Sequence, residues 1–198
     1  MSARKSMPPG AVPVRERILD AAVRVLSREG AKSLAQPQIA KEAGVPQGHL
    51  TYYFPKKIDL VRGVADHMGA LILQELGPLL AQHSGSTMRE KFIAIATRVA
   101  KNRGRTRILL ALLVEMEHDE ALHDELSGRV GALRALFASL MERESDDPDV
   151  DVVLAAAWGL GLQHLILEGR RSDAETERRF ERLLEWMESP PAKRTRAK

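Results

Sequence analysis

Apolar residues recur at three- and four-residue spacings along almost the whole chain, and this periodicity limits the possible fold more than any other feature. Ile18, Ala22, Val25 and Leu26 form one such stripe, which stops at Gly30. Val, Ile and Thr nowhere alternate with polar residues over the length of a strand. Spacing of this kind is typical of amphipathic helices, so we expect an all-α protein of about nine helices.

Proline suits the first turn of a helix, and glycine suits the position just past its end. The residues expected to mark these limits are Pro13, Pro55 and Pro148 for starts and Gly30, Gly104 and Gly169 for ends. The patterns Thr87-Met-Arg-Glu90 and Ser172-Asp-Ala-Glu175 predict helix caps, and Asp147 predicts another. Helices are expected over about 55–82, from 87 onwards, and over 105–117, 119–144, 148–168 and 173–188.

Composition removes several classes of protein. Cysteine is absent, which excludes disulfides, cysteine metal ligands and a cysteine nucleophile. The N-terminal residues lack the apolar run of a signal peptide, and no segment approaches about 18 uninterrupted apolar residues. We therefore expect a cytoplasmic protein with no membrane contact.

Charge is divided unevenly along the chain. Residues 1–62 hold 11 Lys and Arg against 5 Asp and Glu, whereas residues 63–188 hold 15 against 22. The last ten residues add four cations. A basic head on an acidic body indicates that the head alone meets a polyanion, although small domains also vary in charge by chance.

Residues 36–53 predict a helix-turn-helix. Ala40 is small enough for two helices to cross closely, and Gly44 four residues later suits a left-handed turn. Val45 fills the corner, and Leu50 anchors a second short helix to the core. The spacing of a small residue, a glycine and an aliphatic residue is typical of DNA-binding helix-turn-helix units.

The residues of the second short helix that face outwards are suited to base edges and phosphates. They are Gln47, His49, Thr51 and one or both of Tyr52 and Tyr53. The alternative is that the tyrosines pack a small core, and we expect one of them to do so with Phe54. Lys56 and Lys57 follow at the start of a long helix, where their charge and free helix amides both attract a phosphate.

The segment Ile39-Ala-Lys-Glu-Ala-Gly-Val-Pro-Gln-Gly-His-Leu-Thr-Tyr-Tyr-Phe-Pro-Lys-Lys-Ile-Asp-Leu60 resembles the DNA-binding motif of TetR-family regulators. The resemblance extends over about residues 14–62, and the rest of the chain shares only the all-helical plan. It implies a recognition helix at 47–53, in which the residues facing the groove are Gln47, Gly48, His49 and Thr51. It also implies phosphate contacts from Tyr52 or Tyr53 and from Lys57, and further contacts at Gln36 and Gln38. Ala35 stands where the family usually has a capping Ser or Thr, so the first short helix should lack its cap.

The resemblance also implies four regions: a disordered basic arm (1–12), a DNA-binding domain (13–62), a helical body (63–189) and a disordered basic tail (190–198). The body would form a homodimer through its last two helices. The helix after Pro148 is apolar on nearly every side, so a partner or the chain's own core must bury it. Small residues at 155, 159 and 161 fit a close approach of the partner. The expected dimer contacts are Ala155, Gly159, Leu162, Leu183 and Trp186.

The same body would hold a largely apolar small-molecule effector. The candidate lining residues are Met68, Leu71, Phe92, Ile95, Leu113, Met116, Phe137, Trp158 and Leu162. Each of them also suits an ordinary core position. Candidate polar anchors are Gln74, Glu115, His118 and His164. A metal site at His118 and His123 is disfavoured, because their five-residue spacing does not bring both rings to one helix face.

The function expected from these features is a homodimeric transcriptional regulator, usually a repressor, that binds a palindromic operator in double-stranded DNA and leaves it on binding an effector. A small helical enzyme and a protein-interaction adaptor are the alternatives. No Ser/His/Asp set, carboxylate pair or phosphate loop stands at a telling spacing, so no catalytic residue or cofactor is expected.

Overall fold

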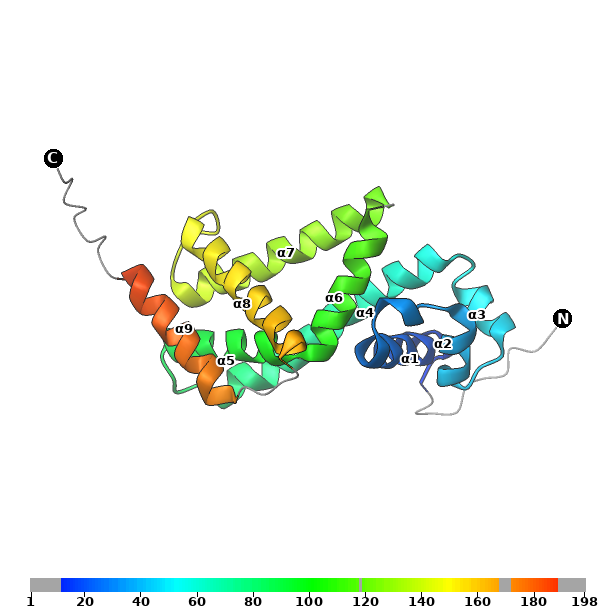
Figure 1. The fold of residues 1–198 in the computed structure, drawn as a ribbon, viewed down its shortest axis with the longest axis horizontal. Helices are drawn as coiled ribbons and strands as arrows, with labels where there is room; N and C mark the ends of the chain where they lie inside the picture. The colour runs from blue at the N-terminus through cyan, green and yellow to red at the C-terminus, as the bar shows by residue number, and fades with distance from the viewer. Residues whose placement is uncertain (1–11, 118, 168–171, 189–198) are drawn as a thin grey trace. The chain divides into compact units, whose positions relative to one another are not determined.

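The computed structural model describes residues 12–117, 119–167 and 172–188, and all regular structure within these ranges is helical. The expected all-α fold is therefore confirmed for the described residues (Figure 1). The helices are α1 (Val14–Glu29), α2 (Gln36–Ala43), α3 (Gln47–Tyr53), α4 (Lys57–Gln82), α5 (Met88–Lys101), α6 (Arg103–Met116), α7 (Glu120–Met141), α8 (Pro148–Ile166) and α9 (Asp173–Glu188), with a 3-10 turn η1 (Ala31–Ser33). The predicted basic arm, apart from Val12, the predicted tail and Gly169 lie outside the described residues.

Most of the predicted helix limits are confirmed. Gly30 ends α1 with a φ of 78°. Thr87 and Glu90 form both bonds of a capping box at the start of α5. The Asp147 side chain accepts a hydrogen bond of 2.9 Å from the amide of Asp149 at the start of α8. These caps satisfy amides that have no partner inside the helix, which is why the sequence could predict them.

The prediction that Gly104 ends a helix was wrong. Gly104 lies inside α6, and the chain breaks two residues earlier, at Asn102. The Asn102 side-chain oxygen accepts a 3.0 Å hydrogen bond from the amide of Arg105. Asn102 therefore caps the start of α6, so the helix begins before the glycine.

The prediction that a helix continues to about Glu144 was also wrong. Helix α7 ends at Met141, and Glu142 adopts a left-handed backbone with a φ of 55°. The amide of Arg143 then donates a 3.0 Å hydrogen bond to the carbonyl of Ala138. A left-handed residue followed by such a bond is a usual way to end a helix, and it needs no glycine.

The described residues fall into two compact units. The first contains the residues up to Ala70 together with 107–122, and the second contains 71–106 and 123 onwards. The first unit thus extends past Arg62, where the sequence predicted a domain boundary. Its core is built from α1, α2, α3 and the start of α4, and includes Ile18, Leu26, Ile39, Leu50 and Leu60.

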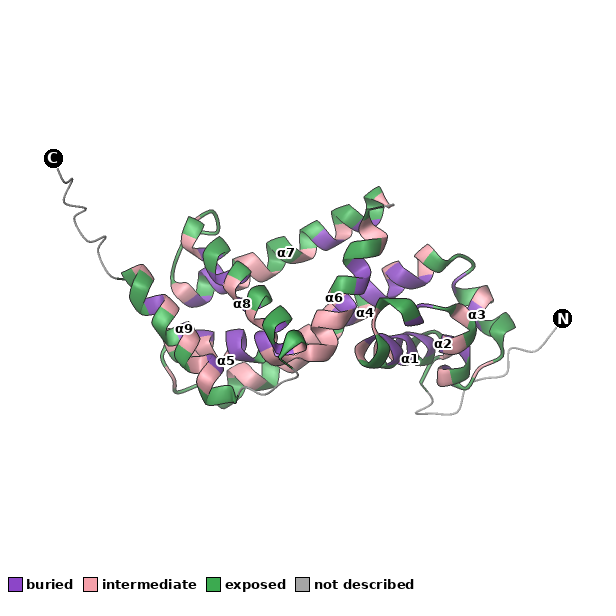
Figure 2. Cartoon of the chain, viewed as in Figure 1, coloured by how far each residue is buried: buried purple, intermediate pink, exposed green. Residues whose placement is uncertain are grey.

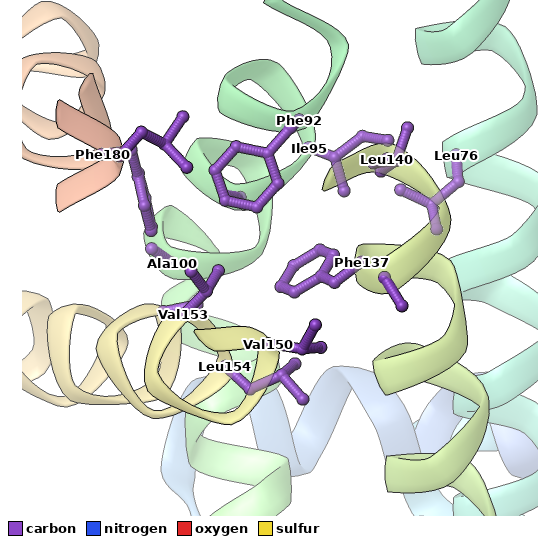
Figure 3. Packing of buried hydrophobic residues seen from close by; sticks show 14 residues of the cluster. Leu76, Phe92, Ile95, Ala100, Phe137, Leu140, Val150, Val153, Leu154 and Phe180 are labelled. Atoms are coloured by element: carbon purple, nitrogen blue, oxygen red, sulfur yellow. The ribbon is translucent and has the colours of Figure 1, made fainter. Parts of the chain in front are cut away.

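The second unit has a core formed where α5 packs against α8 and α9. Phe92 lies at its centre, with ring centroids 5.5 Å from Phe137 and 6.1 Å from Phe180, both in edge-to-face geometry (Figure 3). Val150 and Leu154 of α8 close the same cluster. All three rings are buried, so these three phenylalanines fill a packed core.

Helix α8 is buried on one side only within the single chain (Figure 2). Val150, Val153, Leu154 and Ala157 face the core, but much of the rest of the helix is exposed. Among the described helices, α8 alone has the length and composition of a membrane-crossing segment, a criterion that core helices of soluble proteins also meet. The expected all-round burial therefore needs something besides the described chain.

Candidate nucleic-acid interface

The turn between α2 and α3 has the geometry that the sequence predicted. Gly44 ends α2 in the left-handed conformation, with φ 63° and ψ 39°. The amide of Val45 donates a 3.0 Å hydrogen bond to the carbonyl of Ala40, which is 3% exposed. Because a residue with a Cβ is strained at this φ, Gly44 sets the direction in which α3 leaves the turn.

Arg17 of α1 holds this turn from the other side. Its Nη2 atom donates hydrogen bonds of 2.9 Å to the carbonyl of Ala43 and 3.2 Å to that of Gly44. These carbonyls lie at the end of α2, where a cation is favoured. Sequence reasoning missed Arg17, because no local pattern links it to a turn 26 residues away.

Helix α3 buries a single side chain, that of Leu50. Gln47, Gly48 and His49 are exposed, and Thr51 is half-buried. The Thr51 hydroxyl donates to carbonyls of its own helix, at 3.2 Å from those of Gln47 and Gly48. A short helix anchored at one point and polar elsewhere presents its outer face as a ready contact surface.

The expectation that one tyrosine packs into the core was wrong. Tyr52 is 78% exposed and Tyr53 40% exposed, and their rings meet edge to face with centroids 5.2 Å apart. Phe54 is 2% exposed and takes the core position alone. Arg15 of α1 lies over the Phe54 ring, 5.5 Å from its centroid. Both tyrosines are therefore free to contact a partner.

Gln36 and Gln38 make contacts within the protein. The Gln36 side-chain amide donates a 3.0 Å hydrogen bond to the carbonyl of Phe54, at the end of α3. The Gln38 amide donates to a Glu29 carboxylate oxygen at 2.5 Å. Ala35 makes no side-chain cap, as predicted. The structure therefore ties the start of α2 to the end of α3 through Gln36.

An ion-pair network joins α1 to α2. Glu42 accepts hydrogen bonds of 3.2 Å from both Arg24 and Arg28. These two bonds lower the pKa of the Glu42 carboxyl, with Arg24 the larger cause. Arg28 and then Gln38 lower the pKa of Glu29 in the same way. The network keeps these carboxylates ionised and paired.

The start of α4 carries the two lysines expected near a phosphate. The Lys57 ammonium lies 2.5 Å from a carboxylate oxygen of Glu115 on α6, and both residues belong to the first unit. The Lys56 amide donates a 2.9 Å hydrogen bond to the Asp59 side chain. One of the helix amides expected to attract a phosphate is thus already occupied, and the Lys57 charge has a partner.

The nine candidate effector-lining residues are divided between the two units. Met68, Leu113 and Met116 belong to the first unit, and the other six belong to the second. Phe92, Ile95 and Phe137 are fully buried in the packed core, Leu71 is half-buried, and Trp158 and Leu162 are exposed on α8. A cavity of about 330 Å³ in the second unit shares only Phe92 with this set; it is lined by Thr87, Met88, Arg89, Phe92, Leu140, Met141, Glu142, Arg143, Leu184, Met187 and Glu188.

The candidate polar anchors have different surroundings. Gln74 is exposed, Glu115 pairs with Lys57, and His118 lies outside the described residues. His164 is buried, with one ring nitrogen 3.1 Å from the carbonyl of Ala100. Within the described ranges, no group of three or more His, Cys, Asp or Glu side chains is arranged to hold a metal ion.

The candidate dimer contacts lie at the surface of the single chain. Ala155, Gly159 and Leu162 are exposed on α8, Leu183 is half-buried, and Trp186 on α9 is 72% exposed. Gly161 differs from the expectation. A Cβ there would lie 3.0 Å from the Thr106 hydroxyl and 3.4 Å from the Ala100 carbonyl, so Gly161 serves a close approach inside the chain.

Two family models match the chain. Residues 18–64 match a model described as "Bacterial regulatory proteins, tetR family". Residues 86–186, about half of the chain, match "Tetracyclin repressor-like, C-terminal domain". The first match covers the helix-turn-helix, most of α1 and the start of α4.

Curated relatives and solved structures agree with these models. The nucleoid occlusion factor SlmA of Vibrio atlanticus is 29% identical over 153 residues, covering 74% of this chain and 78% of that protein. A TetR-family member from Streptomyces coelicolor has a TM-score of 0.64 at 23% identity, covering 87% of this chain and 98% of that one. The multidrug binding protein EbrR, complexed with imidazole, has a TM-score of 0.61 at 25% identity, covering 93% and 99%.

Proposed function

This chain belongs to the TetR family of bacterial regulatory proteins, and on that premise we propose that it acts as a cytoplasmic homodimer that binds a palindromic operator and leaves it when a small-molecule effector binds. Family membership makes it a DNA-binding transcriptional regulator. The repressor role, the dimer, the operator and the absence of enzymatic activity are parts of the proposal. The proposed DNA-contacting domain is residues 13–62, and the proposed effector-binding and dimerisation domain is residues 63–189.

The observation that carries the proposal is the exposure of α3. A helix of seven residues with one buried anchor, exposed polar side chains and two exposed tyrosines has the size and chemistry to enter a major groove. Gly48 adds no side chain, and nothing lies within 4 Å of where its Cβ would be. In the proposed complex, Gln47, His49 and Thr51 contact base edges, while the tyrosines and Lys57 contact phosphates.

The exposed stripe of α8 supports the proposed dimer. Val152, Ala155, Gly159, Leu162 and Ile166 are all exposed in the single chain, and they follow one another at alternating three- and four-residue intervals. Such spacing forms a seam along one helix face, and two seams bury each other in a helical bundle. Trp186 of α9 would extend the contact. A two-fold dimer would then cover the apolar surface that the chain leaves open.

In the proposed mechanism, the dimer presents two recognition helices about 34–36 Å apart, one turn of the double helix. An effector that binds one dimer geometry more tightly than another shifts the population towards it. If the favoured geometry has a different spacing, both helices can no longer enter the groove together. The similarity to EbrR, whose structure contains imidazole, supports a small-molecule effector.

The proposal is tested with purified protein and duplexes from the region upstream of its own gene. We expect a preference for one duplex over a random sequence of equal length, with two chains per complex. Lys57→Ala should weaken binding to every duplex, whereas His49→Ala should alter the preference. A protein with no preference for any such duplex would overturn the operator proposal. A monomeric mass in solution and on DNA would overturn the dimer.

A further inference from the structure

The ion pair between Lys57 and Glu115 lies at the proposed DNA-contacting face. Lys57 is the first residue of α4, and Glu115 lies near the end of α6, 58 residues further along the chain. The Lys57 side chain is 52% exposed and the Glu115 side chain 24%, so the cation faces solvent while the carboxylate is mostly covered. The more accessible partner is thus the one assigned to a phosphate.

Glu115 is held in place without help from Lys57. Arg62 follows Lys57 on α4, and it donates hydrogen bonds of 2.6 and 2.9 Å to the carboxylate of Asp119, four residues after Glu115. At the other end of the segment, Arg107 donates a 2.9 Å hydrogen bond to the carbonyl of Ser27 at the end of α1. Because these contacts hold α6 and Asp119 against α1 and α4, the backbone at Glu115 stays beside Lys57 when the pair breaks.

We propose that Glu115 competes with a DNA phosphate for the Lys57 ammonium and so lowers the affinity of the regulator for DNA. The inference rests on the proposed DNA-binding function and adds a residue outside the helix-turn-helix that sets its strength. An ammonium has three donors, but a carboxylate and a phosphate brought to one cation repel each other. When a lysine neutralises a DNA phosphate, counterions are released from the DNA, and this release favours binding. A lysine already neutralised by Glu115 releases fewer counterions and so adds less to the affinity.

The test replaces the carboxylate with an amide of the same shape. Glu115→Gln is compared with Glu117→Gln. Glu117 is an exposed residue two positions after Glu115, so this control removes the same charge nearby. Both substitutions are made in the natural chain and in Lys57→Ala, and circular dichroism checks the fold of each. Binding to a random-sequence duplex is measured over a range of salt concentrations, because a phosphate contact needs no particular sequence.

We expect Glu115→Gln to bind about two- to fivefold more tightly, the range of an exposed ion pair. The slope of log affinity against log salt should steepen by up to about 0.9, the value for one phosphate. Glu117→Gln should leave the slope unchanged, and the gain from Glu115→Gln should vanish in Lys57→Ala.

Equal effects of the two glutamate variants would overturn the proposal, as would a gain that persists in Lys57→Ala. Those results would leave the DNA-binding function standing as long as Lys57→Ala alone weakens binding. A protein that binds no duplex in any variant would overturn the proposed function and this inference with it.

Discussion

The side-chain amide of Gln36 donates a 3.0 Å hydrogen bond to the backbone carbonyl of Phe54, joining the first residue of α2 to the residue that follows α3. The carbonyls at a helix end lack partners inside the helix, so this bond satisfies one of them. It also fixes the junction through which α3 passes into α4. Gln36 thus stabilises the end of α3 from within the protein.

Gln36→Ala should therefore destabilise the first unit without removing a phosphate contact. We expect the free energy of unfolding to fall by about 0.5–1.5 kcal/mol, the usual contribution of one hydrogen bond. Urea titration measures this, with Gln74→Ala, at an exposed side chain of α4, as the matched control, expected to change stability by less than about 0.5 kcal/mol. The salt dependence of DNA binding should stay the same. A shallower slope in Gln36→Ala would show instead that Gln36 contacts a phosphate.

Gly63→Ala should disturb the same junction from the core side. A Cβ at Gly63 would lie 2.8 Å from Phe54 Cε1 and 3.0 Å from Leu19 Cδ2, and both side chains are buried. Overpacking of this kind costs about 1–3 kcal/mol, which exceeds the gain of about 1 kcal/mol from replacing a helical glycine. Gly131→Ala in α7 meets nothing within 4 Å and should be neutral or stabilising. Equal thermal midpoints for the two variants would contradict the expected clash.

His49→Ala should change which sequences the protein prefers. An exposed side chain near the start of a recognition helix contributes about 1–3 kcal/mol of discrimination at its base pair. Selection from a randomised duplex library, with and without the substitution, should show relaxed preference at one position of each half-site. Unaltered preference with uniformly weaker binding would assign His49 to a phosphate.

Leu162→Asp should give a monomer that remains folded. Leu162 is already 43% exposed in the single chain, so the carboxylate costs little there, whereas it would be buried in the proposed dimer seam. Leu73→Asp, at a side chain that is 73% exposed on α4, is the control and should stay dimeric. Light scattering after size exclusion gives both masses. A dimeric Leu162→Asp would place the interface elsewhere.

The Arg62–Asp119 pair should make stability fall in acid. The Arg62 hydrogen bonds, followed by the bond from the Leu122 amide, lower the pKa of the Asp119 carboxyl. A carboxyl whose pKa is lower in the folded state stabilises the fold above its unfolded pKa of about 3.9, and this contribution is lost as the pH falls through the folded value. Asp119→Asn should therefore be less stable than the natural chain at neutral pH, with the difference closing below about pH 4. A difference independent of pH would contradict this account.

Local patterns predicted the parts of the fold that depend on nearby residues. The three- and four-residue spacing gave the helices, Gly44 gave the turn, and the Thr87–Glu90 pattern gave a cap, because each of these is settled within a few positions. Asn102 and Glu142 were harder to predict. Asn102 predicts a helix start, but Gly104 two residues later predicts a helix end, and the sequence alone does not decide between them. A left-handed glutamate such as Glu142 has no sequence pattern of its own.

Contacts between distant residues could not be predicted in the same way. Periodicity shows which face of a helix is apolar, but not what covers that face. The candidate effector residues were therefore split between packed core, exposed surface and two units. Arg17 on the turn and Glu115 on Lys57 join residues 26 and 58 positions apart, and only the folded chain brings them together.

The tyrosines and the tryptophans lie on different exposed surfaces of the chain. Its two tyrosines, Tyr52 and Tyr53, lie exposed on α3, and its two tryptophans, Trp158 and Trp186, lie exposed on α8 and α9. Tyrosine emission would therefore report the proposed recognition helix. Tryptophan emission, which longer wavelengths excite selectively, would report the proposed dimer surface of α8 and α9. A titration with DNA and a dilution series could each be followed without a label, on two optical signals that the protein already carries.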